Sequence, residues 1–388
     1  MRVSLLTGAD DATYAIPLAA SLADQGIQVE FIGNDEMATS SRLSRANIHY
    51  VNLRGNQDPR APIHTKIARI LRYYRDLIRY TSRTDARVFH ILWLNKFELL
   101  DRTILNVFYK LCGKRLVFTA HNVNARKRDA NDTWVNRATL RAMYWIVDHI
   151  FVHTDVSKDE LVRDFRVAPA KVTVIPFGLN IHVPDTPLTK GEARTLLGLA
   201  PADEVLLFFG QIAPYKGLDL LVDALEMLAP HRPGCRLIVA GRAKAGADPY
   251  WRPLKARLER APLRPWTLVK DGFIPDDEVP ILFRAADVLV LPYRAIYQSG
   301  PLSLAFRFGI PVIATRVGSF GHDVVPGVTG LLCEPEDPRD LARAIGEYFE
   351  SELYREGEQA GKRIREIASE KYSWEGISRA IVEVYAQL

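Results

Sequence analysis

The sequence predicts an α/β protein built from two domains, each a doubly wound sheet of parallel strands. Its 388 residues exceed what one ordinary core accommodates. In both halves, short apolar runs typical of buried strands alternate with helical patterns, and this alternation favours parallel sheets. A proline-containing stretch with little periodicity separates the halves. We therefore expect two Rossmann-like domains that face each other across a cleft, with ligands at the carboxyl ends of both sheets.

The expected elements follow the same order in both halves. The first half has strand patterns at 3–6, 27–32, 88–94, 116–119, 150–153 and 172–175, with a helix at 14–25. The second half has strand patterns at 204–209, 236–240, 267–270, 288–292 and 311–315, and helices at 218–228, 278–285, 302–308 and 338–349. We place the N-terminal domain at 1–181, a hinge at 182–190 and the C-terminal domain at 191–365. A last helix within 366–388 is expected to pack back on the N-terminal domain.

Composition and short motifs argue against a disulfide-rich protein, a zinc protein, a membrane-spanning protein and a nucleic-acid-binding protein. A hydrophobic fraction of 48% and a charged fraction of 25% are typical of globular domains. The three cysteines show no CxxC or Cys/His spacing, so we expect reduced thiols rather than disulfides or a zinc site. No apolar run is long enough to span a bilayer, and the N-terminus lacks a secretory signal pattern. We expect a cytoplasmic protein, and no motif for nucleic-acid recognition is present.

Basic charge is concentrated in part of the first half. Between residues 54 and 141 there are 19 basic and 7 acidic side chains. Such an excess predicts an anionic partner, either a phosphate-bearing acceptor or an acidic lipid surface. The alternative is a solvated surface that keeps the protein soluble.

Segment 66–80 has the pattern of an amphipathic helix. An apolar stripe comprises Ile67, Ile70, Leu71, Tyr74, Leu77 and Ile78. The basic residues are Lys66, Arg69, Arg72, Arg75 and Arg79, and a second basic cluster is Arg126, Lys127 and Arg128. The usual outcome is a helix that packs its stripe on the core. The basic face also suits acceptor phosphates or the inner face of an anionic membrane, with peripheral association.

Two segments of the second half have the pattern of a phosphate site. A buried strand ends at Gly210, and Lys216-Gly217 opens the next helix. Farther on, Ser299-Gly300-Pro301 has an N-cap serine, a glycine that permits close approach and a proline in the first turn. Helix N-termini and a lysine attract phosphate oxygens. The alternatives are an ordinary loop lysine, expected to be mostly solvated, and a well-capped structural helix.

Together these segments resemble the C-terminal domain of glycosyltransferase family 4 and its GT-B relatives. Further matching segments are Val174-Ile-Pro-Phe-Gly178, Leu237-Ile-Val-Ala-Gly241, the loop at 325–335 and Tyr372-Ser-Trp-Glu375, while Thr119-Ala-His-Asn122 resembles the family's histidine loop. The resemblance implies the GT-B fold. It also implies a retaining hexosyltransferase that moves a sugar from a nucleotide-diphosphate sugar to a glycan or lipid-linked acceptor, in surface polysaccharide or glycolipid biosynthesis.

The resemblance also implies roles for individual residues. His121 and Lys216 are the implied catalytic residues, with His121 against the donor sugar and Lys216 on the diphosphate. The implied donor-binding residues are Gly8, Gln211, Lys216, Phe273, Ile274, Arg294, Gln298, Ser299, Gly300 and Pro301. Of these, Gly8 is expected near the diphosphate, and Phe273 and Ile274 near the base.

The sequence departs from the family at four positions. Gln211 replaces a usual arginine, Ile296 and Leu304 replace two usual glutamates, and Ala9 replaces the second glycine of a usual Gly-Gly pair. Donor recognition is therefore expected to be rearranged, with Arg294 and Gln298 as stand-ins. A non-catalytic nucleotide- or glycan-binding relative and a GT-B epimerase remain alternatives.

No metal or other cofactor is expected. The chain lacks a convincing Asp-x-Asp site, and Asp10-Asp11 is the one acidic pair near a predicted strand end, where a solvated turn is our preferred interpretation. A sugar that leaves a nucleotide diphosphate develops negative charge on the phosphate. Positioned cations and helix N-termini stabilise that charge without a metal ion.

Overall fold

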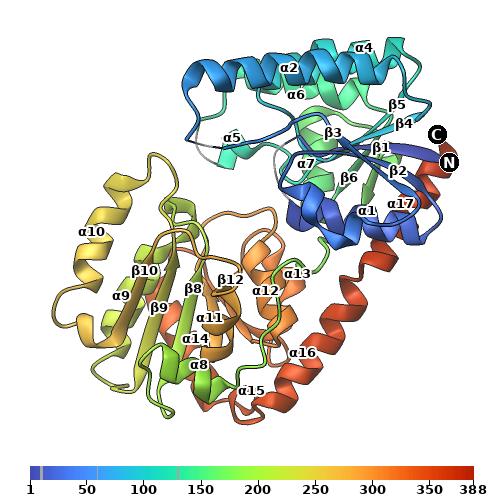
Figure 1. Ribbon diagram of the computed structural model, residues 1–388. Helices are drawn as coiled ribbons and strands as arrows, with labels where there is room; N and C mark the ends of the chain where they lie inside the picture. Colours follow the sequence, from blue (N-terminus) through green and yellow to red (C-terminus); the bar gives the residue numbers. More distant parts are fainter. Residues whose placement is uncertain (9–11, 59, 129–130) are drawn as a thin grey trace. The chain divides into compact units, whose positions relative to one another are not determined.

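The structure is a computed structural model that describes the chain except for residues 9–11, 59 and 129–130. The chain divides into two compact units. Unit 1 comprises Met1–Gly178 and Tyr372–Leu388, and unit 2 comprises Leu179–Lys371. Each unit contains one parallel sheet flanked by helices (Figure 1). The α/β fold with two doubly wound sheets is thereby confirmed.

Unit 1 contains a seven-stranded sheet in the order β3-β2-β1-β4-β5-β6-β7. Its strands are β1 (Arg2–Leu6), β2 (Gln28–Gly33), β3 (Ile48–Asn52), β4 (Val88–Ile91), β5 (Arg115–Thr119), β6 (His149–Val152) and β7 (Val172–Val174). The chain winds outward from β1 to β3 and then returns to place β4 beside β1. The carboxyl ends of β1 and β4 therefore flank the switch point, where doubly wound sheets bind ligands.

The helices of unit 1 cover both faces of this sheet. They are α1 (Ala12–Asp24), α2 (Ile63–Thr81), α3 (Glu98–Leu100), α4 (Asn106–Leu111), α5 (Ala125–Arg128), α6 (Trp134–Ile146), α7 (Asp155–Phe165) and α17 (Trp374–Gln387), with a π-helical turn η3 at Asp101–Leu105. Helices α1 and α17 share one apolar cluster with Val3 and Leu5 of β1. Phe89 of β4 instead packs against Tyr80 of α2 and Tyr109 of α4.

Unit 2 repeats the scheme with six strands in the order β10-β9-β8-β11-β12-β13. The strands are β8 (Glu204–Phe209), β9 (Cys235–Gly241), β10 (Thr267–Asp271), β11 (Val288–Leu291), β12 (Val312–Thr315) and β13 (Gly330–Cys333). The helices are α8 (Lys190–Leu196), α9 (Leu218–Leu228), α10 (Asp248–Leu258), α11 (Val279–Ala285), α12 (Gly300–Phe308), α13 (Phe320–Asp323), α14 (Pro338–Glu350), α15 (Glu352–Arg355) and α16 (Glu358–Lys371). Here β8 and β11 flank the switch point.

The unit boundaries differ from the expected ones by a few residues. The first segment of unit 1 ends at Gly178, whereas the hinge was expected at 182–190. Helix α8 begins at Lys190, inside that stretch, because Thr189 and Glu192 form a capping box. Residues 366–371 belong to α16 of unit 2, so the segment that returns to unit 1 begins at Tyr372 and consists mainly of α17.

Unit 1 contains several buried histidines, among them His90, His121 and His153. His90 of β4 contacts the hydroxyl groups of Thr119 and Tyr385 at 2.7 and 2.5 Å. His153 lies 3.0 Å from the Nδ1 atom of His121. Burial lowers the pKa of His90 to about 3 and that of His153 to about 4, and it holds the pKa of His121 well below its usual value. All three rings are therefore neutral at neutral pH.

We predict that unit 1 loses stability as the pH falls from about 6.5 toward 4. In this window the unfolded chain protonates histidine at its ordinary pKa of about 6.5, whereas the folded chain does not, so protons favour unfolding. Each buried histidine should lower the free energy of unfolding by up to about 1.4 kcal/mol per pH unit. The measurement is chemical unfolding of the wild type, His153→Gln and His64→Gln at several pH values. His153→Gln should show a shallower pH dependence, and a dependence equal to that of the wild type would contradict the prediction. His64 is exposed and serves as the control.

Candidate functional site

The loop between β8 and α9 is folded tightly against the end of β11. One 3₁₀ turn at Pro214–Lys216 leads into Gly217, the N-cap of α9, whose φ is +64°. A Cβ atom at Gly217 would lie 1.9 Å from the carbonyl oxygen of Pro292. A side chain at this position would clash and would strain the backbone. The glycine therefore holds Lys216 beside the end of β11.

The side chain of Lys216 is buried, with 6% of its surface exposed. Its Nζ atom lies 5.0 Å from the centre of the Tyr293 ring. A Cβ atom built at Gly210 would stand 3.1 Å from the same nitrogen. The lysine thus turns back toward the carboxyl end of β8. The expectation of a mostly solvated lysine is wrong, because the ring of Tyr293 and the bare strand end at Gly210 accommodate its side chain inside the fold.

The helix start expected at Ser299 is present. The Ser299 hydroxyl oxygen accepts a hydrogen bond from the backbone N–H of Leu302 at 3.3 Å, and α12 begins at Gly300. A Cβ atom at Gly210 would lie 3.4 Å from the Cγ atom of Pro301, in the first turn of α12. Lys216 and the N-terminus of α12 therefore converge on Gly210. An ammonium group and a helix N-terminus at one point favour an anion.

Arg294 joins the two segments of this candidate site. Its guanidinium group donates two hydrogen bonds to Asp219, at 2.8 and 2.7 Å, and others to Glu336 and to the carbonyl oxygen of Pro214. Its backbone N–H also donates to the carbonyl oxygen of Tyr215 at 2.7 Å. Burial opposes ionisation of Asp219, but the bonds from Arg294 outweigh it and lower the pKa of Asp219. Arg294 therefore anchors the Lys216 loop, and a direct contact with a donor stays a prediction.

The residues expected near a base lie at the sheet edge of unit 2. Phe273 and Ile274 follow β10, two strands away from β8. Phe273 is 73% exposed, and Ile274 is half-buried. An exposed aromatic ring offers a face on which a base can stack. Their roles in binding stay predictions.

The two apolar residues that replace the usual glutamates are packed inside unit 2. Leu304 of α12 is buried, and Ile296 is half-buried with its carbonyl oxygen against Gly318. Helix α12 therefore brings no acidic side chain to the site. Gln211 is exposed directly after Gly210, and Gln298 is half-buried beside Ser299. Both amides lie next to the converging segments, so they stay candidates for donor binding.

In unit 1 the expected residues surround the end of β1. Gly8 has a φ of +53°, and a Cβ atom there would lie 1.9 Å from the carbonyl oxygen of Trp93. The ring of His121 stacks on that of Trp93, with centroids 4.1 Å apart and planes 8° apart. His121 is buried, and burial holds its pKa well below the usual value, so its ring is neutral at neutral pH. Its contact with a donor sugar stays a prediction. Asp10 and Asp11 lie outside the described residues.

Carboxylates compensate part of the charge in both expected basic clusters, and on α2 Arg75 and Arg79 lie 2.9 and 3.9 Å from Asp76. Arg126 donates to Glu98 at 3.1 Å, and Lys127 pairs with Glu160 and Asp164 at 3.4 and 3.2 Å. The structure describes the backbone of Arg128 in α5 but not its side chain. The residues Lys66, Arg69, Arg72, Arg75 and Arg79 all lie on α2. The cluster at 126–128 is thus partly neutralised by carboxylates.

In the chain apart from residues 9–11, 59 and 129–130, three or more His, Cys, Asp or Glu side chains nowhere gather in an arrangement that could hold a metal ion. None of the helices there has both the length and the apolar character required to cross a bilayer. The expectation that no metal is needed stays a prediction.

Comparison with known families accounts for nearly the whole chain. Residues 12–183 match the profile of Glycosyltransferase Family 4, and residues 190–367 match that of Glycosyl transferases group 1. A D-inositol 3-phosphate glycosyltransferase of Actinosynnema mirum is 31% identical over 71% of this chain and 67% of its own length. A lipopolysaccharide core biosynthesis mannosyltransferase, LpsB of Rhizobium meliloti, is 33% identical over 56% of this chain and 61% of its own length. Among the first relatives matched, the shared region spans 55 to 67% of the relative's length.

Comparison with solved structures also identifies the fold. The structure of Anabaena Alr3699/HepE in complex with UDP superposes with a TM-score of 0.75, covering 100% of both chains at 19% identity. At this identity the likeness shows the fold alone, and that fold is GT-B. The profile matches and the relative from Actinosynnema mirum show that this chain belongs to the group 1 glycosyltransferases.

Proposed function

We propose that this enzyme transfers a sugar from a nucleotide-diphosphate sugar to a glycan or lipid-linked acceptor at a membrane surface, in surface polysaccharide or glycolipid biosynthesis. The observation that carries the proposal is the convergence of Lys216 and the N-terminus of α12 on Gly210. Unit 2 then binds the donor, and unit 1 supplies the acceptor side. Retention of the anomeric configuration is proposed on the family resemblance.

The proposed chemistry rests on stabilising the leaving group. Negative charge grows on the departing phosphate as the bond to the sugar breaks. The Lys216 ammonium group and the N–H groups at the start of α12 would offset this charge without a metal ion. Tyr293 and the Arg294–Asp219 pair hold the lysine loop in place before the donor arrives, so little reorganisation is required.

The relatives support the donor and acceptor classes in this proposal. The HepE structures hold UDP and UDP-glucose. One relative is described as acting in lipopolysaccharide core biosynthesis, and several are D-inositol 3-phosphate glycosyltransferases. The exposed ring of Phe273 is available to stack on the base of such a donor.

We predict that the purified protein hydrolyses or transfers sugar from at least one member of a nucleotide-sugar panel, also in the presence of EDTA. A donor site made of a lysine and helix N–H groups needs no divalent ion. Product formation is followed by mass spectrometry. Nucleotide binding without turnover would favour the non-catalytic alternative, which the apolar Ile296 and Leu304 keep open. Loss of turnover in EDTA would contradict the metal-independent mechanism.

We predict that Lys216→Met lowers the affinity for a nucleoside diphosphate by about ten- to a hundredfold, because one charge-assisted contact to phosphate is worth roughly 1.5–3 kcal/mol. Methionine keeps an unbranched side chain beside Tyr293 and thus limits the loss of packing. Calorimetric titration compares the wild type, Lys216→Met and Lys362→Met, a change of an exposed lysine on α16. Affinity for the bare nucleoside should be the same in all three. An unchanged diphosphate affinity in folded Lys216→Met would place the phosphates elsewhere.

The exposed side chains of unit 1 support a membrane surface as the place of action. The apolar stripe expected on α2 is only partly buried: Leu77 and Tyr74 pack inward, whereas Ile67 and Leu71 are 52% and 61% exposed. Trp134 and Trp145, near the two ends of α6, are 81% and 82% exposed. Exposed tryptophans and an apolar strip flanked by arginines are typical of proteins that lie in a membrane interface.

We predict that the protein sediments with vesicles that contain phosphatidylglycerol and not with neutral vesicles at low salt. Replacing Arg72, Arg75 and Arg79 on α2 with glutamine should lower the bound fraction, because basic residues near an anionic surface add to binding until salt screens them. The control variant replaces Arg42, Arg260 and Arg339 with glutamine. These three arginines are exposed and lie outside α2, and their replacement changes the net charge by the same amount. Equal sedimentation with both kinds of vesicle would contradict the proposal, as would equal losses in both variants.

A further inference from the structure

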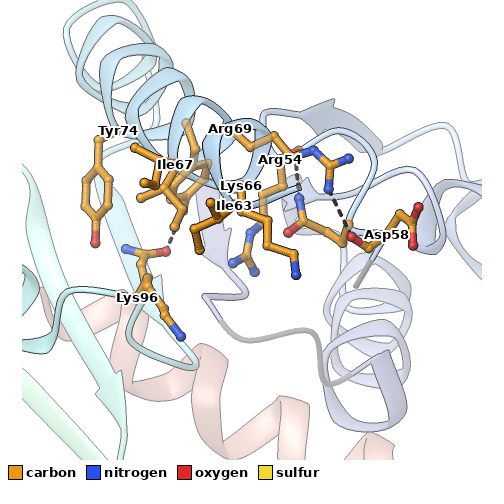
Figure 2. A pocket seen from close by; sticks show the side chains of 12 residues that line it. Arg54, Asp58, Ile63, Lys66, Ile67, Arg69, Tyr74 and Lys96 are labelled. Atoms are coloured by element: carbon orange, nitrogen blue, oxygen red, sulfur yellow. Dashed lines mark hydrogen bonds between the residues drawn. The ribbon is translucent and has the colours of Figure 1, made fainter. Parts of the chain in front are cut away.

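Unit 1 contains a pocket of about 340 Å³ next to the switch point of its sheet. The first part of α2 forms one wall, and the segments after β3 and β4 form the others. Figure 2 shows Lys96 on the side opposite Ile63 and Lys66 of α2. This volume lies within the range of small-molecule sites and is large enough for a monosaccharide-sized group.

The lining of this pocket carries an excess of positive charge. Its basic side chains are Arg54, Lys66, Arg69 and Lys96, and its acidic side chain is Asp58. Arg69 donates to the backbone carbonyl oxygen of Asp58 at 3.3 Å and not to its carboxylate. The guanidinium group of Arg54 lies over the ring of Tyr73, 5.2 Å from its centre. Cations held in this way favour an anionic ligand.

A buried polar network holds the walls of the pocket together. The Tyr73 hydroxyl donates to the side-chain oxygen of Asn95 at 2.6 Å, and the Asn95 amide donates to Asp101 at 3.1 Å. Tyr74 donates to the same Asp101 oxygen at 3.0 Å and accepts the backbone N–H of Phe97 at 3.1 Å. Helix α2 and the segment after β4 are thus locked together. Preorganised walls of this kind are typical of binding sites.

The turn that carries Asp101 is a second feature of a functional site. Residues Asp101–Leu105 form a π-helical turn between α3 and α4. Such turns are rare and frequently occur at functional sites. Here the turn brings the Asp101 carboxylate under the pocket wall, where burial raises its pKa. The carboxylate orients Asn95 and Tyr74, and so it acts as a positioning group.

We infer that this pocket binds a phosphate ester, the anionic end of the acceptor. The inference rests on the proposed function, since it assigns a chemical class to the acceptor of the same enzyme. The phosphate oxygens accept hydrogen bonds from Lys66 and Lys96, which lie on opposite walls, and from Arg54 and Arg69. Ile63, Ile67 and Ile70 line the α2 side and receive the apolar or sugar part next to the phosphate. Because Ile63 and Ile67 are also exposed, the pocket is continuous with the surface proposed to face lipid.

The test titrates the full-length protein with glycerol 3-phosphate and, as the uncharged comparison, with glycerol. The wild type should bind the phosphate ester and not glycerol. Lys66→Gln and Lys96→Gln should each weaken binding by about tenfold, the size expected for one charge-assisted contact. Arg42→Gln is the matched control, because Arg42 is an exposed arginine of unit 1 that does not line the pocket. No binding by the wild type, or an equal loss of affinity in Arg42→Gln, would overturn the inference.

A second arm identifies the source of the phosphate ester. The same variants are sedimented with vesicles of phosphatidylcholine with and without phosphatidic acid. If Lys66→Gln and Lys96→Gln weaken both the binding of glycerol 3-phosphate and the sedimentation with phosphatidic acid vesicles, the ligand is a lipid headgroup. If they weaken only the binding of glycerol 3-phosphate, the ligand is a soluble phosphate ester. Titration with a nucleoside diphosphate is run in parallel. Intact nucleotide binding together with failure of the glycerol 3-phosphate arm refutes this inference alone, whereas absent nucleotide binding and turnover would refute the proposed function.

Discussion

The ends of β8 and β11 approach each other closely because backbone, not side chain, fills the space between them. A Cβ atom at Gly217 would overlap the carbonyl oxygen of Pro292, and one at Gly210 would contact both Lys216 and Pro301. This close approach puts the lysine ammonium group and the start of α12 at one point. The donor chemistry proposed for unit 2 depends on it, since neither group alone makes a phosphate site.

In unit 1, buried polar side chains hold neighbouring elements together. His90 joins β4 and β5 to Tyr385 of α17, so the end of the chain becomes part of the core of unit 1. Asp101 similarly joins α2 to the segment after β4 through Tyr74 and Asn95. Because a buried polar group is costly when it is unsatisfied, each such contact selects one arrangement of its helices. The second network joins two walls of the pocket in unit 1.

Sequence patterns predicted the central strands and missed two edge strands. Central strands such as β8 and β11 read as continuous apolar runs because both of their faces are covered. Strand β3 at one edge is half-exposed with a mixed pattern, and β13 has four residues and begins with a glycine. The start of α12 at Ser299 was predictable because an N-cap depends on a few neighbouring residues. The burial of Lys216 was not, because the ring that covers it comes from a different strand.

Local pattern therefore determined most elements of this protein: the alternation of strands and helices, the helix start at Ser299, the loop before α9 and the amphipathic character of α2. The tertiary structure decided how these elements are used. It brought Gly210, Lys216 and Pro301 together, turned Arg294 toward Asp219, and left Ile67 and Leu71 of α2 exposed while Leu77 was buried. The physical reason is that burial and charge compensation depend on neighbours that are distant in the sequence. A stretch of residues sets its own periodicity and hydrogen-bonding capacity, but it does not specify which side chains from other strands and helices will cover it.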